Sequence, residues 1–232
     1  QLSRPHLSCR EVTRVPMTEQ KPKIRRSTAA PVKTRDDQVI DRRRSLLKAA
    51  VKVISKRGLT GVTINSMAAE AECSYGVVAF HFQSKEGIIF AALDYTAAEY
   101  EAFLAKLNAS ERSPAERIRH MIDTDFSRKA AGQDSIALWL AFWAEAARVP
   151  NFRKRCAALR VHYNEAVTAD VTELASLRGI RADAAQIAVT LNAMISGLWV
   201  ENLLLPITIA EGQKRGHDAC LSYMRLIFPE DF

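Results

Sequence analysis

The 232-residue sequence lacks the cysteine pattern that marks zinc proteins and disulfide-rich secreted proteins. Its four cysteines, Cys9, Cys73, Cys156 and Cys220, are far apart and show no paired CxxC-like spacing. Reduced thiols and a cytoplasmic location fit this distribution. We therefore expect no metal site and no bound cofactor.

Long hydrophobic runs are also missing. The longest, at 138–144 and 193–200, end at Glu145 and Glu201, well short of the residues needed to span a bilayer. The basic N-terminus has no apolar segment behind it, so it does not resemble a secretory signal peptide. The sequence predicts a soluble protein that does not insert into a membrane.

Motifs of catalysis are absent as well. The patterns GxGxxG, GxxxxGK[ST], GxSxG and HExxH do not occur, and the five histidines do not cluster. The sequence therefore nominates no catalytic residue, and we expect no enzymatic activity. A small helical enzyme is the alternative, and it would require titratable side chains from distant positions to meet in one cleft.

The positive charge lies at the N-terminal end. Residues 1–44 hold twelve Lys and Arg against five Asp and Glu, which equals the net charge of +7 of the whole chain. Prolines are scattered through residues 1–36 without any apolar period, which is typical of disorder. A basic arm suits contact with phosphate groups, and a solvated leader without a function is the alternative.

Helical periodicity covers the rest of the chain, and strand signals are nearly absent. Breaks at Gly58, Gly132, Pro150, Gly179 and Pro206 divide it into an all-α fold of about nine helices with short connections. The expected helices are 40–57, 64–71, 75–82, 85–107, 114–126, 135–148, 151–177, 182–205 and 208–227.

Two of these helices are short and follow each other closely. Thr63 is a good N-cap for the first and Ser74 for the second, with a tight turn at Glu72 and Cys73 between them. Two capped helices within about twenty residues predict a helix-turn-helix, a common DNA-reading element. Ordinary helix packing is the alternative.

In a helix-turn-helix, the N-terminal part of the second helix reads base edges in the major groove. Gly76 would allow a close backbone approach, and Tyr75, Val77 and Phe80 are the candidates for contacts with bases and sugars. The candidates for phosphate contacts are Thr63, Ser74, His81 and Lys85, two of which cap helix N-termini that favour an anion.

The stretch 63–86 resembles the signature of TetR-family repressors. Glu72 replaces the glycine usual in this family, and Ala79 replaces a tyrosine that contacts phosphate. Arg42, Arg43 and Arg44 are the residues expected to offset the missing contact. The positions that carry the resemblance are Thr63, Met67, Ala68, Ala71, Ser74, Gly76, Val78, His81, Phe82, Lys85 and Glu86.

The resemblance implies a DNA-binding domain at 37–84 and a helical domain at 85–232 that binds an effector and pairs two copies into a homodimer. Such a dimer would read a pseudo-palindromic double-stranded operator with half-sites roughly 34–36 Å apart. The helices 182–205 and 208–227 are the expected dimerisation elements. A DNA-binding protein without an effector is the alternative.

The run 137–145, with Pro150 and 197–199, is similar to BetI-type repressors, which control choline-to-glycine-betaine genes and respond to choline. The resemblance implies choline as the small-molecule effector, and a regulator of another pathway with a different effector is the alternative. The segment after Leu203 and residues 1–40 depart most from this branch.

Aromatic residues in the same region fit a quaternary ammonium ligand. Trp139 and Trp143 share a helix face, with Phe142 beside them, and indole rings attract cations that offer no hydrogen bond. We expect these three residues and Trp199 to bind the ligand. The alternative is that all four rings fill the core. Candidates for an acidic partner are Asp123, Asp125, Glu145 and Glu201.

Overall fold

The computed structural model describes residues 34–232, and every regular element in this range is a helix, as the sequence predicts. The disorder expected for the N-terminal segment falls mainly on residues 1–33, which lie outside the described residues. The elements are α1 (Arg35–Arg57), the 3-10 turn η1 (Leu59–Gly61), α2 (Ile64–Glu70), α3 (Tyr75–His81), α4 (Lys85–Asn108), α5 (Pro114–Asp125), α6 (Gln133–Ala146), α7 (Pro150–Arg178), α8 (Ala184–Leu204) and α9 (Ile209–Ile227).

The first helix starts earlier than the apolar pattern predicts. Thr34 caps it by accepting a hydrogen bond from the backbone N–H of Asp37, whose carboxylate accepts one from the Thr34 backbone in return. This capping box satisfies N–H groups that would otherwise lack partners. Ile40, where the predicted helix begins, is 64% exposed because the first turns of α1 extend beyond the bundle.

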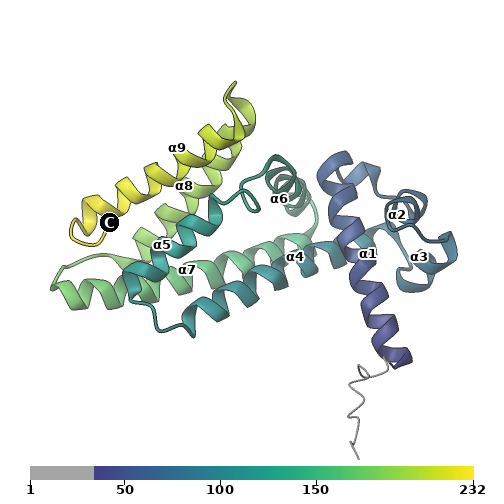
Figure 1. Cartoon of the computed structure of the whole chain (residues 1–232), viewed down its shortest axis with the longest axis horizontal. Coiled ribbons are helices and arrows are strands. Elements are labelled where there is room, and N and C mark those ends of the chain that lie inside the picture. Colours follow the sequence, from purple (N-terminus) through teal and green to yellow (C-terminus); the bar gives the residue numbers. More distant parts are fainter. Residues whose placement is uncertain (1–33) are drawn as a thin grey trace, which may run out of the picture.

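Helices α1, α2 and α3 form a small bundle at one end of the molecule (Figure 1). Leu46, Met67, Val78 and Ile88 are fully buried in its core, and Ile88 comes from the start of α4. The far end of α4 belongs to a second core, so this helix connects the two parts of the chain directly.

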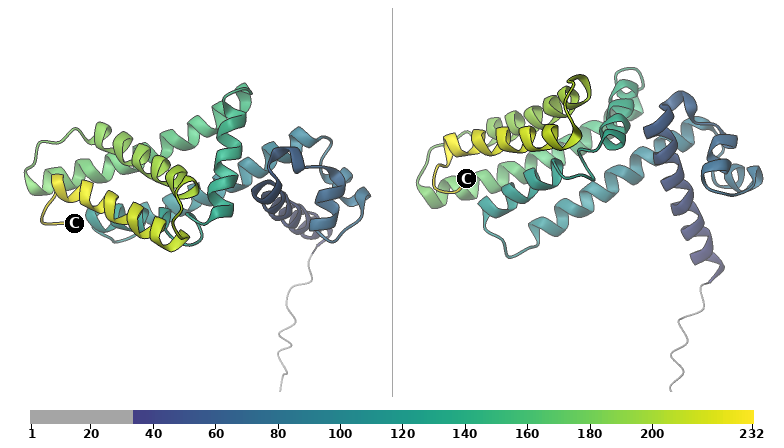
Figure 2. Two further views of the ribbon diagram at one scale, coloured as in Figure 1. Left: turned by 90° about the horizontal axis from the view of Figure 1, so that it is seen from above. Right: turned by 45° about the horizontal axis from the view of Figure 1, so that its top comes forward.

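The second part consists of α5 to α9 together with the C-terminal half of α4. Helix α7 lies at its centre and packs against α4, α5, α6 and α8. Two views in Figure 2 show α8 and α9 side by side on one face. Met121, Val167, Leu191 and Met224 bring α5, α7, α8 and α9 together in a shared core.

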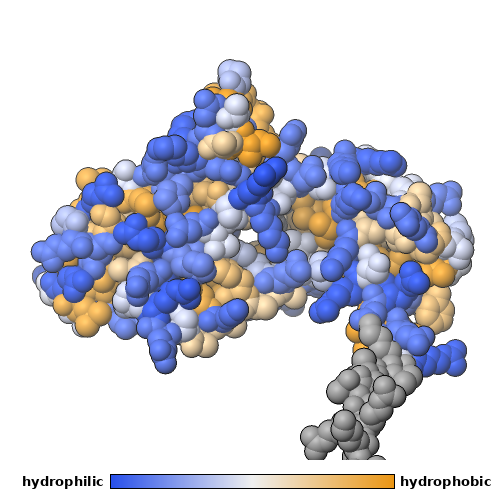
Figure 3. All heavy atoms as spheres, in the orientation of Figure 1, coloured by the Kyte–Doolittle hydropathy of each residue, from blue (hydrophilic) through white to orange (hydrophobic). Residues whose placement is uncertain are grey.

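Within residues 34–232, one helix, α8, is long and apolar enough to cross a membrane, judged by its length and composition alone. A core helix of a soluble protein passes the same test, and α8 packs against both α7 and α9. Leucines lie exposed where α8 ends, and hydrophobic surface is visible at the top of Figure 3 near this connection. The side of α8 that carries Ala185, Val189, Ala193 and Gly197 is also exposed, and we call it the uncovered side of α8.

Candidate functional site

One of the two caps predicted for the helix-turn-helix is formed as expected. The Thr63 hydroxyl accepts a hydrogen bond from the Ser66 backbone at 3.0 Å, and the Ser66 hydroxyl accepts one from the Thr63 N–H at 2.9 Å. Ser74 occupies the N-cap position of α3, although its side chain makes no capping bond. The turn between the helices is closed by a 2.9 Å bond from the Cys73 N–H to the Ala68 carbonyl.

Glu72 has a backbone conformation that normally suits glycine. Its φ of +48° is positive, unlike that of any other non-glycine residue in the described part of the chain. The side chain is exposed, so no burial compensates for the left-handed conformation. The turn therefore keeps the geometry of a glycine-containing helix-turn-helix, at a cost in stability of roughly 1 kcal/mol.

Replacing Glu72 with glycine should increase the free energy of unfolding by about 1 kcal/mol, because glycine adopts positive φ without a steric penalty. Urea unfolding of the Glu72→Gly and Glu72→Ala variants measures the difference, since alanine keeps the penalty and also lacks the carboxylate. Equal stability of the glycine and alanine variants would show that the turn is not strained.

Two of the three side chains predicted to contact bases are exposed on α3, whereas Val77 is half-buried against the core of the first bundle. Tyr75 is 56% exposed and Phe80 is 76% exposed, although both are large and hydrophobic. Gly76 is exposed between them, so the backbone of α3 is open to close approach. Arg42 of α1 lines a shallow groove together with Gly76 and Phe80. An uncovered aromatic surface beside a cation suits contact with bases and phosphates.

Two of the predicted phosphate-contacting cations have partners within the protein. Arg43 donates to the His81 carbonyl at 3.0 Å and lies over the Phe82 ring, so it fixes the end of α3. Lys85 donates to the Thr60 carbonyl at 3.3 Å. Burial, with the charges of Arg43 and Arg42, lowers the pKa of His81, so this residue would offer a neutral imidazole to a phosphate.

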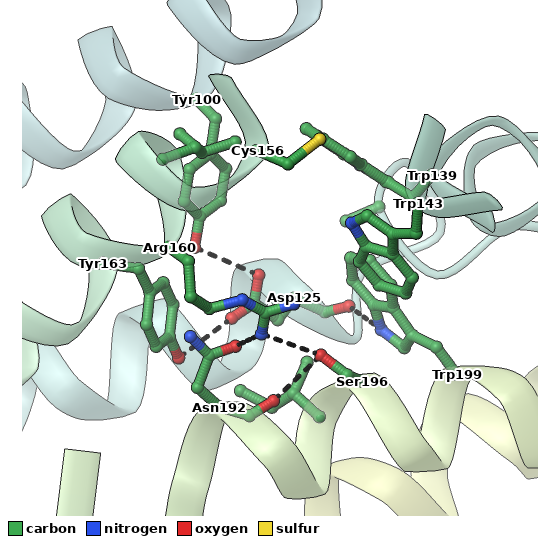
Figure 4. Close-up of a pocket in the computed structure, with 13 residues that line it drawn as sticks. Tyr100, Asp125, Trp139, Trp143, Cys156, Arg160, Tyr163, Asn192, Ser196 and Trp199 are labelled. Atoms are coloured by element: carbon green, nitrogen blue, oxygen red, sulfur yellow. Dashed lines mark hydrogen bonds between the residues drawn. The ribbon is translucent and has the colours of Figure 1, made fainter. Parts of the chain in front are cut away.

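A cavity of about 110 Å³ lies between α4, α5, α6, α7 and α8 (Figure 4). This volume is below the roughly 150 Å³ of a cavity that holds benzene, but the cavity is partly open, so a small ligand can extend toward its mouth. The lining residues are Tyr100, Asp125, Ala130, Trp139, Trp143, Cys156, Leu159, Arg160, Tyr163, Asn192, Ile195, Ser196 and Trp199.

Three of the four predicted ligand-binding aromatics line this cavity. Trp139 and Trp143 stack with ring centroids 6.3 Å apart, and the Trp199 Nε1–H donates to the Asp125 backbone carbonyl at 3.0 Å. Phe142 is a correction, because it is fully buried in the N-terminal core and does not line the cavity. Helix α6 is apolar on both sides, and Phe142 lies on the side that packs toward the first bundle.

Asp125 is the acidic candidate that the structure brings to the cavity. It is almost completely buried, and its carboxylate accepts hydrogen bonds of 3.4 Å from the hydroxyl groups of Tyr100 and Tyr163. Burial raises its pKa to about 7, against the opposing effects of the two tyrosines and Arg160. The cavity therefore holds a carboxyl group that ionises close to neutral pH.

The other acidic candidates have different partners or positions. Asp123 is bonded to His217, and Glu201 pairs with Arg215 on the surface. Glu145 is half-buried and does not line the cavity.

The raised pKa of Asp125 predicts a pH-dependent stability. Between about pH 4 and 7 this carboxyl is neutral in the folded chain and ionised in the unfolded chain, so the free energy of unfolding should fall as pH rises. The slope should reach at most about 1.4 kcal/mol per pH unit and level off above pH 7. Urea unfolding from pH 5 to 8 should show this slope relative to Asp125→Asn. Parallel pH profiles would contradict the assignment.

Apart from Asp125, the polar residues of the cavity were not predicted from the sequence. Arg160 of α7 donates to Asn192 and, at 3.0 Å, to Ser196, both on α8, and its guanidinium lies 5.5 Å from the Trp143 ring centroid. Arg160 and Tyr163 recur at helical spacing on α7, as do Asn192 and Ser196 on α8. Polar residues at this spacing within otherwise apolar helix faces are the signal that could have revealed the site.

Two family models match the chain. The model for bacterial regulatory proteins of the tetR family matches residues 46–92, which include the helix-turn-helix. The model for the C-terminal domain of BetI-type transcriptional repressors matches residues 114–228, which include most of the cavity.

Curated relatives and solved structures agree with these matches. The regulator BetI of Brucella anthropi is 32% identical over 165 residues, covering 70% of this chain and 82% of the relative. BetI of Burkholderia cenocepacia is 28% identical over 195 residues, covering 82% and 95%. A transcriptional regulator from Saccharomonospora viridis, crystallised in complex with choline, has a TM-score of 0.71 and 21% identity over 80% of this chain and 96% of its own. At 21% identity, the similarity to the Saccharomonospora viridis regulator shows a shared fold.

Proposed function

Because the chain belongs to the TetR family of transcriptional regulators, with the C-terminal domain of BetI-type repressors, we propose that it represses transcription by binding an operator and that a small quaternary ammonium compound releases it. The members of this family are regulators, not enzymes. In the proposal, residues 37–84 bind DNA in the cytoplasm and residues 85–232 bind the effector and form the dimer.

The exposed aromatic surface of α3 is the observation that supports this function most. Tyr75 and Phe80 lie uncovered on a seven-residue helix that is held by a capped partner helix. In the proposal they contact bases, with Val77 and the exposed backbone at Gly76 beside them. Thr63, Ser74, His81, Lys85 and Arg42 to Arg44 provide phosphate contacts, of which Arg43 and Lys85 act partly by bracing the domain.

The uncovered side of α8 supports a homodimer. Ala185, Val189, Ala193 and Gly197 recur every four residues, and all are exposed. Three of the four side chains are small, which allows a second helix to approach closely, and Val189 adds exposed hydrophobic surface. A two-fold axis beside α8 and α9 would then place two copies of α3 on one operator.

An ion-pair cluster joins α7, which lines the cavity, to α4, which begins in the core of the DNA-binding domain. Arg155 of α7 donates to Asp94 at 2.7 Å and to Glu101 at 2.8 Å, both on α4. Its neighbours Cys156 and Arg160 line the cavity, and the start of α4 lies in the core of the first bundle. A ligand that shifts α7 would therefore move α4 and change the separation of the two reading helices, provided that it binds one arrangement more tightly.

The aromatic rings and Asp125 support a quaternary ammonium effector, with choline as the reference compound. Indole rings attract such a cation, and an ionised carboxylate compensates its charge. The choline complex of the Saccharomonospora viridis regulator is consistent with this class of ligand. Binding of choline should strengthen as pH rises through 7, because Asp125 then ionises.

Thermal-shift titrations of the full chain with choline, betaine aldehyde and unrelated amines test the effector class. Stabilisation by a quaternary amine, lost in Trp143→Ala, is the expected result. Phe142→Leu is the control, because this residue lies outside the cavity. No response to any quaternary amine would contradict the proposed effector class and leave the DNA-binding function to be tested separately.

A further inference from the structure

Four arginines among residues 34–232 are half-buried, and they differ in their partners. Arg119 is held by the Asp231 backbone carbonyl and the Phe232 ring. Arg117 pairs with the carboxylates of Asp170 and Glu173, and Arg155 pairs with Asp94 and Glu101. Arg160 instead donates only to the side-chain oxygens of Asn192 and Ser196 and forms no ion pair within the described residues. A guanidinium partly removed from water is costly without a counter-charge, so a missing partner is significant.

One edge of the Arg160 guanidinium remains open. Both of its hydrogen bonds use Nη1, whereas Nε and Nη2 make none with residues 34–232. The Nε and Nη2 groups together form a fork that matches the two oxygens of a carboxylate. Figure 4 shows the guanidinium at the centre of the cavity, where a ligand would meet it.

The side chain is held in place before any ligand binds. Asn192 is buried, and its amide donates to Asn164 at 3.0 Å while its oxygen accepts from Arg160. The Ser196 hydroxyl, the second acceptor for Arg160, also donates to the Asn192 carbonyl at 3.0 Å. A donor fixed by such neighbours loses little conformational entropy when an anion binds.

Arg160 also changes what the aromatic wall can bind. Its guanidinium already lies over the Trp143 ring, at 5.5 Å from the centroid. A purely cationic ligand on this face would meet a like charge and leave the open edge of Arg160 unpaired. Asp125 is the acidic group of the cavity, and the charge of Arg160 favours its ionised form. The two side chains form no ion pair, and the Asp125 carboxylate accepts from Tyr100 and Tyr163 instead.

We propose that Arg160 is an anion-binding subsite and that the preferred effector is a small zwitterion, with a carboxylate on Arg160 and a quaternary ammonium group near Asp125 and the indole rings. This inference rests on the proposed function and specifies its effector. Such a ligand pairs with both charged groups of the cavity, whereas choline pairs only with Asp125. The cavity of about 110 Å³ limits the two charged groups to a short separation.

Calorimetric titration of the full chain with three matched probes tests the proposal. Glycine betaine carries both charges, choline carries only the cation, and 3,3-dimethylbutanoate carries only the carboxylate on the same branched shape. Glycine betaine should bind at least about 10-fold more tightly than either of the others. Equal or tighter binding of choline would overturn the proposal, as would equal binding of 3,3-dimethylbutanoate or no binding of glycine betaine.

Variants separate an anion contact from a structural role of Arg160. Arg160→Gln should weaken glycine betaine binding roughly 10- to 100-fold without weakening choline, and Arg160→Lys should fall between because lysine lacks the fork. Lys154→Gln is the control for loss of one positive charge on an exposed part of α7. Equal weakening of both ligands in Arg160→Gln would show that Arg160 only supports the cavity and would overturn the proposal.

Operator binding by the same protein samples is measured in parallel, first without ligand and then with choline or glycine betaine added. If the wild-type chain binds its operator and choline releases it while glycine betaine does not, the zwitterion proposal fails and the proposed function stands. If no operator is bound, the proposed function fails regardless of the titrations.

Discussion

Replacing Tyr75 with alanine is expected to weaken operator binding roughly 30-fold or more while leaving the fold intact. A side-chain contact to bases contributes about 1–3 kcal/mol, and a dimer would lose this contact twice. Because the ring is 56% exposed in the free protein, its removal creates no cavity in the core. Fluorescence anisotropy with an operator fragment, over a range of salt concentrations, measures the change.

Two further variants make this result specific. Tyr75→Phe should retain most of the affinity if the ring makes the contact, and should lose it if the hydroxyl does. Leu177→Ala removes a large exposed side chain near the end of α7, far from α3, and should bind normally. Unchanged operator binding by Tyr75→Ala would mean that α3 is not the reading helix.

Replacing Arg117 with methionine should lower the free energy of unfolding by about 3–5 kcal/mol, because it leaves a buried carboxylate without its partner. Arg117 donates to Asp170 at 2.7 Å and to Glu173 at 2.6 Å, and thereby holds α5 against α7. Burial raises the pKa of Asp170 even with Arg117 in place, and Asp170 Oδ2 has no hydrogen-bond partner in the described residues. Urea unfolding near pH 7 measures the loss.

The double variant Arg117→Met, Asp170→Leu is the test of this explanation. It removes both charges, so much of the lost stability should return. If the double variant is as unstable as the single one, the loss comes from packing and not from the unpaired carboxylate. Because α5 ends at Asp125, the single variant should also impair ligand binding.

Much of the fold could be predicted because its determinants are local. Thr63 and Ser113 cap helices through contacts three residues away, and the breaks at Pro150 and Gly179 lie where α7 begins and ends. The start of α1 was missed because it depends on the capping box at Thr34 and not on apolar spacing.

The cavity was harder to predict because its polar contacts join distant segments. Arg160 is held by residues 32 and 36 positions further along the chain, which only the packing of α7 on α8 brings close. Periodicity identified Trp139 and Trp143 as one face of α6. It placed Phe142 wrongly because both sides of that helix are buried, each against a different part of the chain.

We propose that one chain couples sequence-specific DNA binding to occupation of the cavity beside Asp125 and Arg160. The affinity of the full chain for an operator selected from random DNA, measured with and without saturating quaternary ammonium ligand, tests this coupling. We expect tight, sequence-dependent binding that the ligand weakens in the wild type but not in Trp143→Ala. Binding that is indifferent to DNA sequence, or equal with and without ligand, would contradict it.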